Sequence, residues 1–181
     1  GLDRECGGMY LYLNENGELY GDEKGVWFQG RALYIFSSVY NSVEKREEYL
    51  DAAKLIYGFL DKCTDKDGRM FFTVTRDGRE IQKRRYYFSE TFAAIGCAEY
   101  YLATGDEEAK EKAYKYFETA YGIFKDPSKT TPKFNPETAS YKAASPAMMM
   151  LSTAQVIRKL DKKFDDIVTE MIESLTVNGN V

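Results

Sequence analysis

Two stretches of the chain repeat the same order of structural signals at a constant spacing of 61 residues. Residues 8–13 lead to the dipeptide Asn16-Gly17, and residues 70–74 lead to Asp77-Gly78. Asn-Gly and Asp-Gly are the strongest short-range signals for a two-stranded β-hairpin. Each predicted hairpin precedes two helical segments, so the sequence predicts a fold of stacked units, each a hairpin followed by a helix pair.

Helical periodicity covers most of the remaining chain and predicts six helices. Apolar residues recur at three- and four-residue intervals within residues 26–42, 45–62, 88–103, 107–124, 145–160 and 162–175. The first, third and fifth segments carry small and aromatic residues, whereas the other three are more highly charged. We therefore expect one all-α domain over residues 1–181, a toroid whose inner helices line a central funnel. A third, less regular unit is predicted to begin near Phe134.

Charge and composition exclude several classes of function. The net charge is −4 with a pI ≈ 5.1, and the basic residues are scattered, which weighs against nucleic acid or an anionic membrane as partner. No apolar run approaches the roughly 20 residues that span a bilayer. Cys6, Cys63 and Cys97 lack metal-binding spacing, and the chain has no histidine. We expect no metal site, and reduced thiols in a cytoplasmic protein.

One arginine interrupts an aromatic and aliphatic helix in residues 24–36, KGVWFQGRALYIF. A guanidinium group is not buried without partners, so Arg31 must be paired or face a wet cavity. Either it forms an ion pair with Glu90 on the next inner helix, or it binds an anionic or oxygen-rich ligand in the funnel. The 15 Tyr and 11 Phe suit the partly apolar, partly hydrated wall of a binding cavity, but composition alone favours a tyrosine-rich core.

Two segments of the chain resemble a known protein family. Residues 3–41 resemble the N-terminal part of the N-acylglucosamine 2-epimerase family, and they read DRECGGMYLYLNENGELYGDEKGVWFQGRALYIFSSVYN. Residues 86–106, YYFSETFAAIGCAEYYLATGD, look like the next inner helix of that family. The Trp-x-Gln-Gly-Arg form is closer to the acylglucosamine branch than to the cellobiose 2-epimerase branch.

The resemblance implies an (α/α)6 barrel of twelve helices that inverts C2 of a sugar or isomerises aldose to ketose. It implies a small-molecule sugar substrate and no metal or redox cofactor. A base removes the proton next to the carbonyl, an enediolate forms, and a second group returns the proton. The family's proton-transfer groups are two histidines from the later part of the barrel. We therefore expect these 181 residues to be an incomplete barrel, about half of the ring, which is inactive alone.

The resemblance and the repeat together indicate the site residues. Arg31 would stabilise the oxyanion, and Trp27 and Gln29 would bind the substrate beside it. At the 61-residue spacing Trp27 corresponds to Phe88 and Gln29 to Glu90, so Phe88 is predicted to bind substrate and Glu90 to be a candidate base. Met148-Met149-Met150 is interpreted as core.

Three alternatives remain open from the sequence. The missing histidines favour a non-catalytic half barrel that binds a sugar or a protein. A cellobiose 2-epimerase-like protein fits the same residues more loosely. A glycoside hydrolase on a similar barrel needs two carboxylates across the cavity, and this alternative ranks last because Glu90 is the only persuasive inner-wall acid. An exposed apolar inner wall also favours self-association into a homodimer.

Overall fold

The computed structural model describes residues 1–83, 86–131, 135, 137–138 and 143–176. The described part contains six α-helices in the predicted order: α1 (Val26–Ser42), α2 (Glu47–Leu60), α3 (Phe88–Thr104), α4 (Glu107–Lys125), α5 (Ser145–Ile157) and α6 (Asp165–Thr176). Short 3-10 helices follow α2, follow α4 and precede α6, at Asp61–Cys63, Pro127–Lys129 and Lys162–Phe164. The six predicted helices are confirmed, while the start of a third unit near Phe134 lies outside the described residues.

The helix boundaries follow from local capping chemistry. Gly105 ends α3 in the left-handed conformation (φ 74°), which glycine adopts without a steric penalty. The Asp106 side chain then accepts a hydrogen bond from the backbone N–H of Glu108 and begins α4. Arg46 has an extended backbone, so α2 starts at Glu47 rather than at residue 45 as predicted.

Both predicted hairpins are present. Strand β1 (Tyr12–Leu13) pairs antiparallel with β2 (Leu19–Gly21), and β4 (Thr73–Val74) pairs antiparallel with β5 (Glu80–Gln82). The turns are built alike, because Gly17 and Gly78 both have positive φ angles, of 82° and 100°. A further strand, β3 (Lys24–Gly25), joins the second hairpin in the order β3-β4-β5 and was not predicted.

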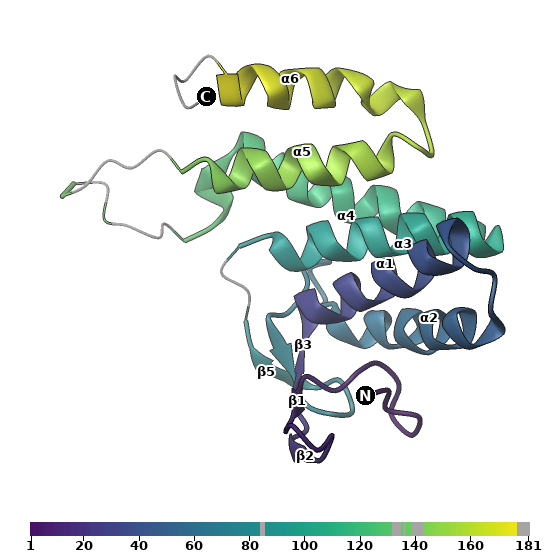
Figure 1. The fold of residues 1–181 in the computed structure, drawn as a ribbon. Coiled ribbons are helices and arrows are strands. Elements are labelled where there is room, and N and C mark those ends of the chain that lie inside the picture. The colour runs from purple at the N-terminus through teal and green to yellow at the C-terminus, as the bar shows by residue number, and fades with distance from the viewer. Residues whose placement is uncertain (84–85, 132–134, 136, 139–142, 177–181) are drawn as a thin grey trace.

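The helices stack as three antiparallel pairs (Figure 1). Helices α1, α3 and α5 contact one another in sequence, while α2, α4 and α6 each pack against the inner helix that precedes them. The inner helices all begin on the same side of the stack, where the β-strands also lie (Figure 1). This arrangement confirms the predicted division into inner and outer helices.

Helices α1 and α3 approach closely at two glycines. A Cβ atom on Gly30 would lie 2.5 Å from the backbone carbonyl carbon of Phe92, and one on Gly96 would lie 2.7 Å from the carbonyl oxygen of Gly30. Side chains of any size at these positions would push the helices apart. The contact therefore fixes how the residues beside Gly30 on α1 meet those beside Phe92 on α3.

Candidate functional site

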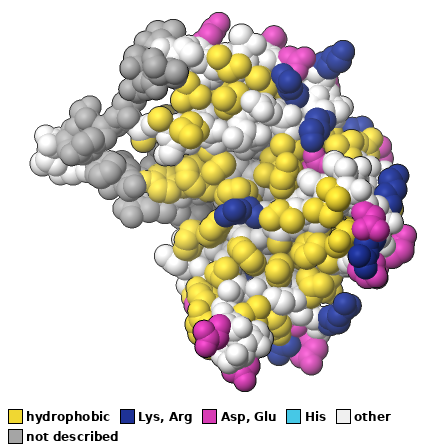
Figure 2. Space-filling view, viewed as in Figure 1, with side chains coloured by type: hydrophobic (Ala, Val, Ile, Leu, Met, Phe, Trp, Pro, Cys, Tyr) yellow, Lys and Arg dark blue, Asp and Glu magenta, His cyan; other side chains and the backbone are white. Residues whose placement is uncertain are grey.

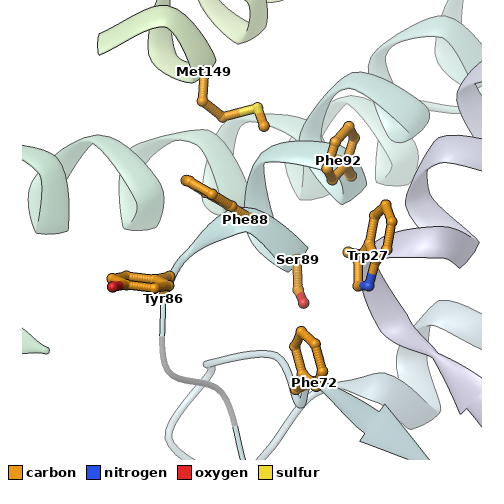
Figure 3. A pocket seen from close by; sticks show the side chains of 7 residues that line it. All are labelled: Trp27, Phe72, Tyr86, Phe88, Ser89, Phe92 and Met149. Atoms are coloured by element: carbon orange, nitrogen blue, oxygen red, sulfur yellow. The ribbon is translucent and has the colours of Figure 1, made fainter. Parts of the chain in front are cut away.

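A cavity of about 370 Å³ opens at the end of the stack where the inner helices begin. Figure 3 shows side chains from α1, α3, α5 and the segment before β4 converging around it. The lining residues are mostly aromatic: Trp27, Phe72, Tyr86, Phe88, Ser89, Phe92 and Met149. In Figure 2, hydrophobic side chains spread across the middle of the molecule, whereas charged ones gather mainly along its edges. Aromatic walls of this kind suit a ligand with a flat apolar face.

Arg31 lies beside this cavity rather than in its lining, and it contacts two of the lining residues. Its guanidinium carbon is 5.3 Å from the ring centroid of Trp27 and 5.4 Å from that of Phe92, and both rings line the cavity. The side chain is exposed. Stacking on ring faces leaves the N–H groups in the guanidinium plane free to donate to a ligand. Arg31 therefore places a fixed positive charge beside an apolar hollow.

The repeat contributes one cavity residue from each inner helix. Trp27, Phe88 and Met149 are spaced by 61 residues and lie near the starts of α1, α3 and α5. The same spacing relates Arg31 to Phe92. The sequence prediction named Trp27 and Phe88, and the structure brings them to one cavity. It missed Phe92 and Met149, although the same spacing applied once more would have indicated both.

Gln29 lies away from the cavity and is fully buried. Its Oε1 atom accepts a hydrogen bond from the backbone N–H of Met9 at 2.8 Å, and its Nε2 atom donates to the carbonyl oxygen of Met9, also at 2.8 Å. Both ends of the amide are therefore satisfied by the N-terminal segment. The expectation that Gln29 lines the substrate pocket does not match this placement.

Glu90 is also fully buried, and its ion-pair partner is Arg69 rather than Arg31. Its Oε1 atom accepts hydrogen bonds from Arg69 Nε at 2.6 Å and from the backbone N–H of Met70 at 3.1 Å. Of the two alternatives left open for Arg31, the ion pair with Glu90 is therefore not formed. Because Glu90 does not line the cavity, the described residues offer no pair of carboxylates across it, which a glycoside hydrolase needs.

The methionine triplet divides between core and cavity. Met150 is fully buried, as predicted, and Met148 is 56% exposed. Met149 points into the cavity opposite the rings of α3 (Figure 3). The interpretation of the whole triplet as core was therefore wrong for two of its three residues.

The cavity side chains favour binding over proton transfer. The hydroxyl of Ser89 donates to the carbonyl oxygen of Phe71 at 3.1 Å and is occupied by that contact. The neighbouring phenol of Tyr87 has a pKa raised to about 12 by burial, so it stays protonated at neutral pH. The remaining lining groups are hydrocarbon rings, a thioether, an indole and the Tyr86 phenol.

Two findings concern metals and membranes. Within the described residues, His, Cys, Asp and Glu side chains form no group of three or more that could hold a metal ion. Among the helices that the structure describes, none is long and apolar enough to cross a membrane.

Comparison with known proteins gives consistent matches. The chain is 31% identical over 176 residues to N-acylglucosamine 2-epimerase of Bos taurus, an alignment that covers 93% of this chain and 42% of the bovine protein. It is 34% identical over 119 residues to cellobiose 2-epimerase of Ruminococcus albus, covering 64% of this chain and 30% of that protein. A solved sugar epimerase from a ruminal bacterium superposes with a TM-score of 0.80 at 25% identity, covering 97% of this chain and 49% of that chain.

These matches fix the fold and the family. Solved epimerases of this kind are (α/α)6 barrels, and the chain spans about half of their length or less. Its six helices thus correspond to about half of such a ring. The sequence model described as N-acylglucosamine 2-epimerase (GlcNAc 2-epimerase) matches residues 8–178. The chain therefore belongs to the N-acylglucosamine 2-epimerase family.

Proposed function

We propose that this chain forms the arginine-bearing half of a ring that epimerises a sugar at C2, of the N-acylglucosamine 2-epimerase type. The observation that carries the proposal is the position of Arg31 beside an aromatic cavity, stacked on two of its lining rings. The similarity to the bovine N-acylglucosamine 2-epimerase favours an N-acylated hexosamine over cellobiose as substrate.

The cavity residues have distinct roles in binding. The C–H face of a sugar ring packs on Trp27 and Phe88, which removes apolar surface from water on both sides. Arg31 then donates hydrogen bonds to the sugar oxygens at the open side of the cavity. Its planar fork suits two neighbouring oxygens, such as O1 and O2 of an open-chain aldose.

The same contact would serve the reaction. Removal of the proton from C2 of the open-chain aldose moves negative charge onto O1 and gives an enediolate. A guanidinium group held in place by Trp27 and Phe92 stabilises that charge without reorganising. Return of the proton to the opposite face of C2 completes the inversion.

Proton transfer needs groups that the 181 residues do not supply. The sequence contains no histidine, and Glu90 is held by Arg69 away from the cavity. We infer that a base and an acid from a further ring segment act on C2. The 181-residue chain alone should bind the sugar without epimerising it. A non-catalytic sugar-binding half barrel would give the same outcome.

Trp27 allows binding to be measured directly, because it is the single tryptophan of the chain and lines the cavity. Titration with N-acetylmannosamine, N-acetylglucosamine and cellobiose should change its fluorescence. Arg31→Met should weaken binding by about tenfold or more, because charged hydrogen bonds to the sugar are lost. Arg46→Met is the matched control, since Arg46 is an exposed arginine that also stacks on a ring, 5.6 Å from Tyr49.

Turnover is tested on the natural gene product by incubating these sugars in D2O and following the C2 proton by NMR. Exchange in the natural product that Arg31→Met abolishes supports the epimerase. Sugar binding without exchange in any form of the protein supports the non-catalytic half barrel instead. If none of the sugars changes the Trp27 signal or exchanges its C2 proton, both candidates fail.

Location and assembly complete the proposal. All three thiols are free, and Cys63 and Cys97 are buried, which suits the reducing cytoplasm. Exposed apolar side chains on the inner and last helices, among them Ile35, Met148 and Ile172, favour association of two copies. Sedimentation of the purified chain at several concentrations tests the homodimer.

A further inference from the structure

Four of the seven cavity-lining residues come from two short segments that are hydrogen-bonded to each other. Phe72 belongs to residues 69–72, which lead into β4, and Tyr86, Phe88 and Ser89 belong to residues 86–90, which begin α3. We propose that Arg69, which is outside the cavity lining, is the positioning residue that holds these two segments in register and so shapes the sugar-binding wall. This inference rests on the proposed function of the cavity.

Arg69 bridges two points on the second segment. Its Nε atom donates to Glu90 Oε1 at 2.6 Å, and its Nη2 atom donates to the backbone carbonyl oxygen of Tyr86 at 3.1 Å. The side chain is 16% exposed, so both contacts are partly shielded from water. A guanidinium group holds two acceptors at a fixed separation, which a flexible ammonium group does not. Arg69 thereby fixes the start of α3 and the aromatic residue before it as one piece.

Glu90 makes this bridge dependent on charge. Its carboxylate is fully buried, and among the described residues its Oε2 atom has no hydrogen-bond partner. Oε1 carries both the Arg69 contact and the hydrogen bond from the backbone N–H of Met70. Without the Arg69 charge the buried carboxylate would be unpaired, which favours its displacement toward water. That displacement would loosen its hold on Met70, two residues before Phe72.

The first repeat unit shows that a hairpin can be tied to its inner helix without such a bridge. There Gln29 alone makes both hydrogen bonds with Met9, the residue equivalent to Met70. Gly8 stands at the position equivalent to Arg69, and a Cβ atom there would lie 2.8 Å from Gln29 Oε1. Both units tie the hairpin to its inner helix, through Gln29 in the first and Glu90 in the second. The hydrogen bond from Arg69 to the Tyr86 carbonyl oxygen is therefore additional to this shared role. It occurs in the unit that supplies most of the cavity wall.

Arg69→Lys separates positioning from stability. A lysine keeps the ion pair with Glu90, but it cannot hold the fixed two-point contact that includes the Tyr86 carbonyl. We expect the melting temperature of Arg69→Lys to stay close to that of the parent chain. We expect its Kd for N-acetylmannosamine, measured by Trp27 fluorescence, to rise about fivefold for the loss of one hydrogen bond. Arg79→Met, in an exposed turn of the same hairpin, is the control and should change neither value.

A second variant covers the case in which Arg69→Lys folds poorly. Arg69→Met combined with Glu90→Gln reproduces the arrangement of the first unit, in which one amide makes both backbone contacts. It should recover the stability lost in Arg69→Met alone while the weakened sugar binding remains. Acrylamide quenching of Trp27 without ligand should increase in both Arg69→Lys and the double variant, because a displaced wall opens the cavity.

The outcomes distinguish this inference from the proposed function. If the parent chain binds none of the sugars, the proposed function fails, and the ligand-free quenching still decides whether Arg69 shapes the cavity. If quenching and affinity in Arg69→Lys equal those of the parent chain, Arg69 has no positioning role. The same conclusion follows if the double variant recovers both stability and affinity, because the effect of Arg69 would then be purely structural.

Discussion

Lys24 provides the sharpest test of what holds the cavity end of the molecule together. Its side chain is fully buried, and its ammonium group donates to Asp3 Oδ2 at 2.8 Å. It also donates to the backbone carbonyl oxygens of Gly7 at 2.6 Å and Arg76 at 2.8 Å, and lies 4.3 Å from the ring centroid of Phe59. One side chain thus joins the N-terminal segment, β3 and the turn of the second hairpin, directly before α1.

Replacing Lys24 by methionine keeps the buried hydrocarbon and removes the charge. Loss of one partner of a buried ion pair costs about 3–5 kcal/mol. Asp3 keeps hydrogen bonds from Arg76 and from the backbone N–H groups of Glu5 and Cys6, which favours the lower end of that range. We therefore expect a free energy of unfolding lower by about 3 kcal/mol. For a chain of this size the melting temperature should fall by about 6–12 °C.

Thermal unfolding followed by circular dichroism at pH 7 measures this change. Lys45→Met is the control, because Lys45 is exposed and its replacement removes the same charge. A fall of less than about 2 °C in Lys24→Met would refute the reasoning, since it would mean that the buried ammonium group adds no net stability over an apolar side chain.

The pH dependence gives an independent check. Burial opposes ionisation of Asp3, but hydrogen bonds from Arg76, Lys24 and two backbone N–H groups outweigh it and hold its pKa well below the usual range. The ionised Asp3 therefore stabilises the fold above the ordinary aspartate pKa of about 3.9, and this contribution is lost as the pH falls below that value. The difference in melting temperature between the parent chain and an Asp3→Asn variant, which cannot ionise at this position, should shrink between pH 6 and pH 3. A constant difference would contradict the assignment.

Two further predictions concern packing and thiol exposure. Gly30→Ala should destabilise the chain by about 2 kcal/mol despite its better helix propensity, because the Cβ atom would lie 2.5 Å from the backbone of α3. Gly58→Ala, at an open helix position, should instead stabilise it by about 1 kcal/mol, and paired melting curves compare them. In the native chain at pH 8, a thiol reagent should modify Cys6 and spare Cys63 and Cys97, whose pKa values are raised by burial, whereas all three should react after unfolding.

The helices and hairpins could be predicted because their signals are local. Hydrophobic periodicity marked the helices, and the predicted segments 88–103 and 107–124 match α3 and α4 to within one residue. Strand β3 could not be predicted, because its pairing with β4 joins Lys24 to Val74, fifty positions later in the chain. Phe72 was missed at the cavity for the same reason, since no periodic pattern places the end of a hairpin against a helix.

The two misplaced site residues have a common geometric cause. Successive residues of an α-helix are rotated by about 100° around the helix axis. Residues two apart are therefore rotated by about 200°, and their side chains point to nearly opposite sides of the helix. Trp27 and Gln29 therefore cannot both face the cavity, and neither can Phe88 and Glu90. Arg31, four residues after Trp27, returns to the cavity side, as its stacking shows.

Each repeat unit thus contains two residues with different roles on opposite sides of its inner helix. The aromatic residue faces the cavity, and the polar residue two positions later ties the hairpin to the back of the same helix. On this basis Gln29→Ala should lower the melting temperature by loosening the N-terminal segment, whereas Trp27→Ala should weaken sugar binding.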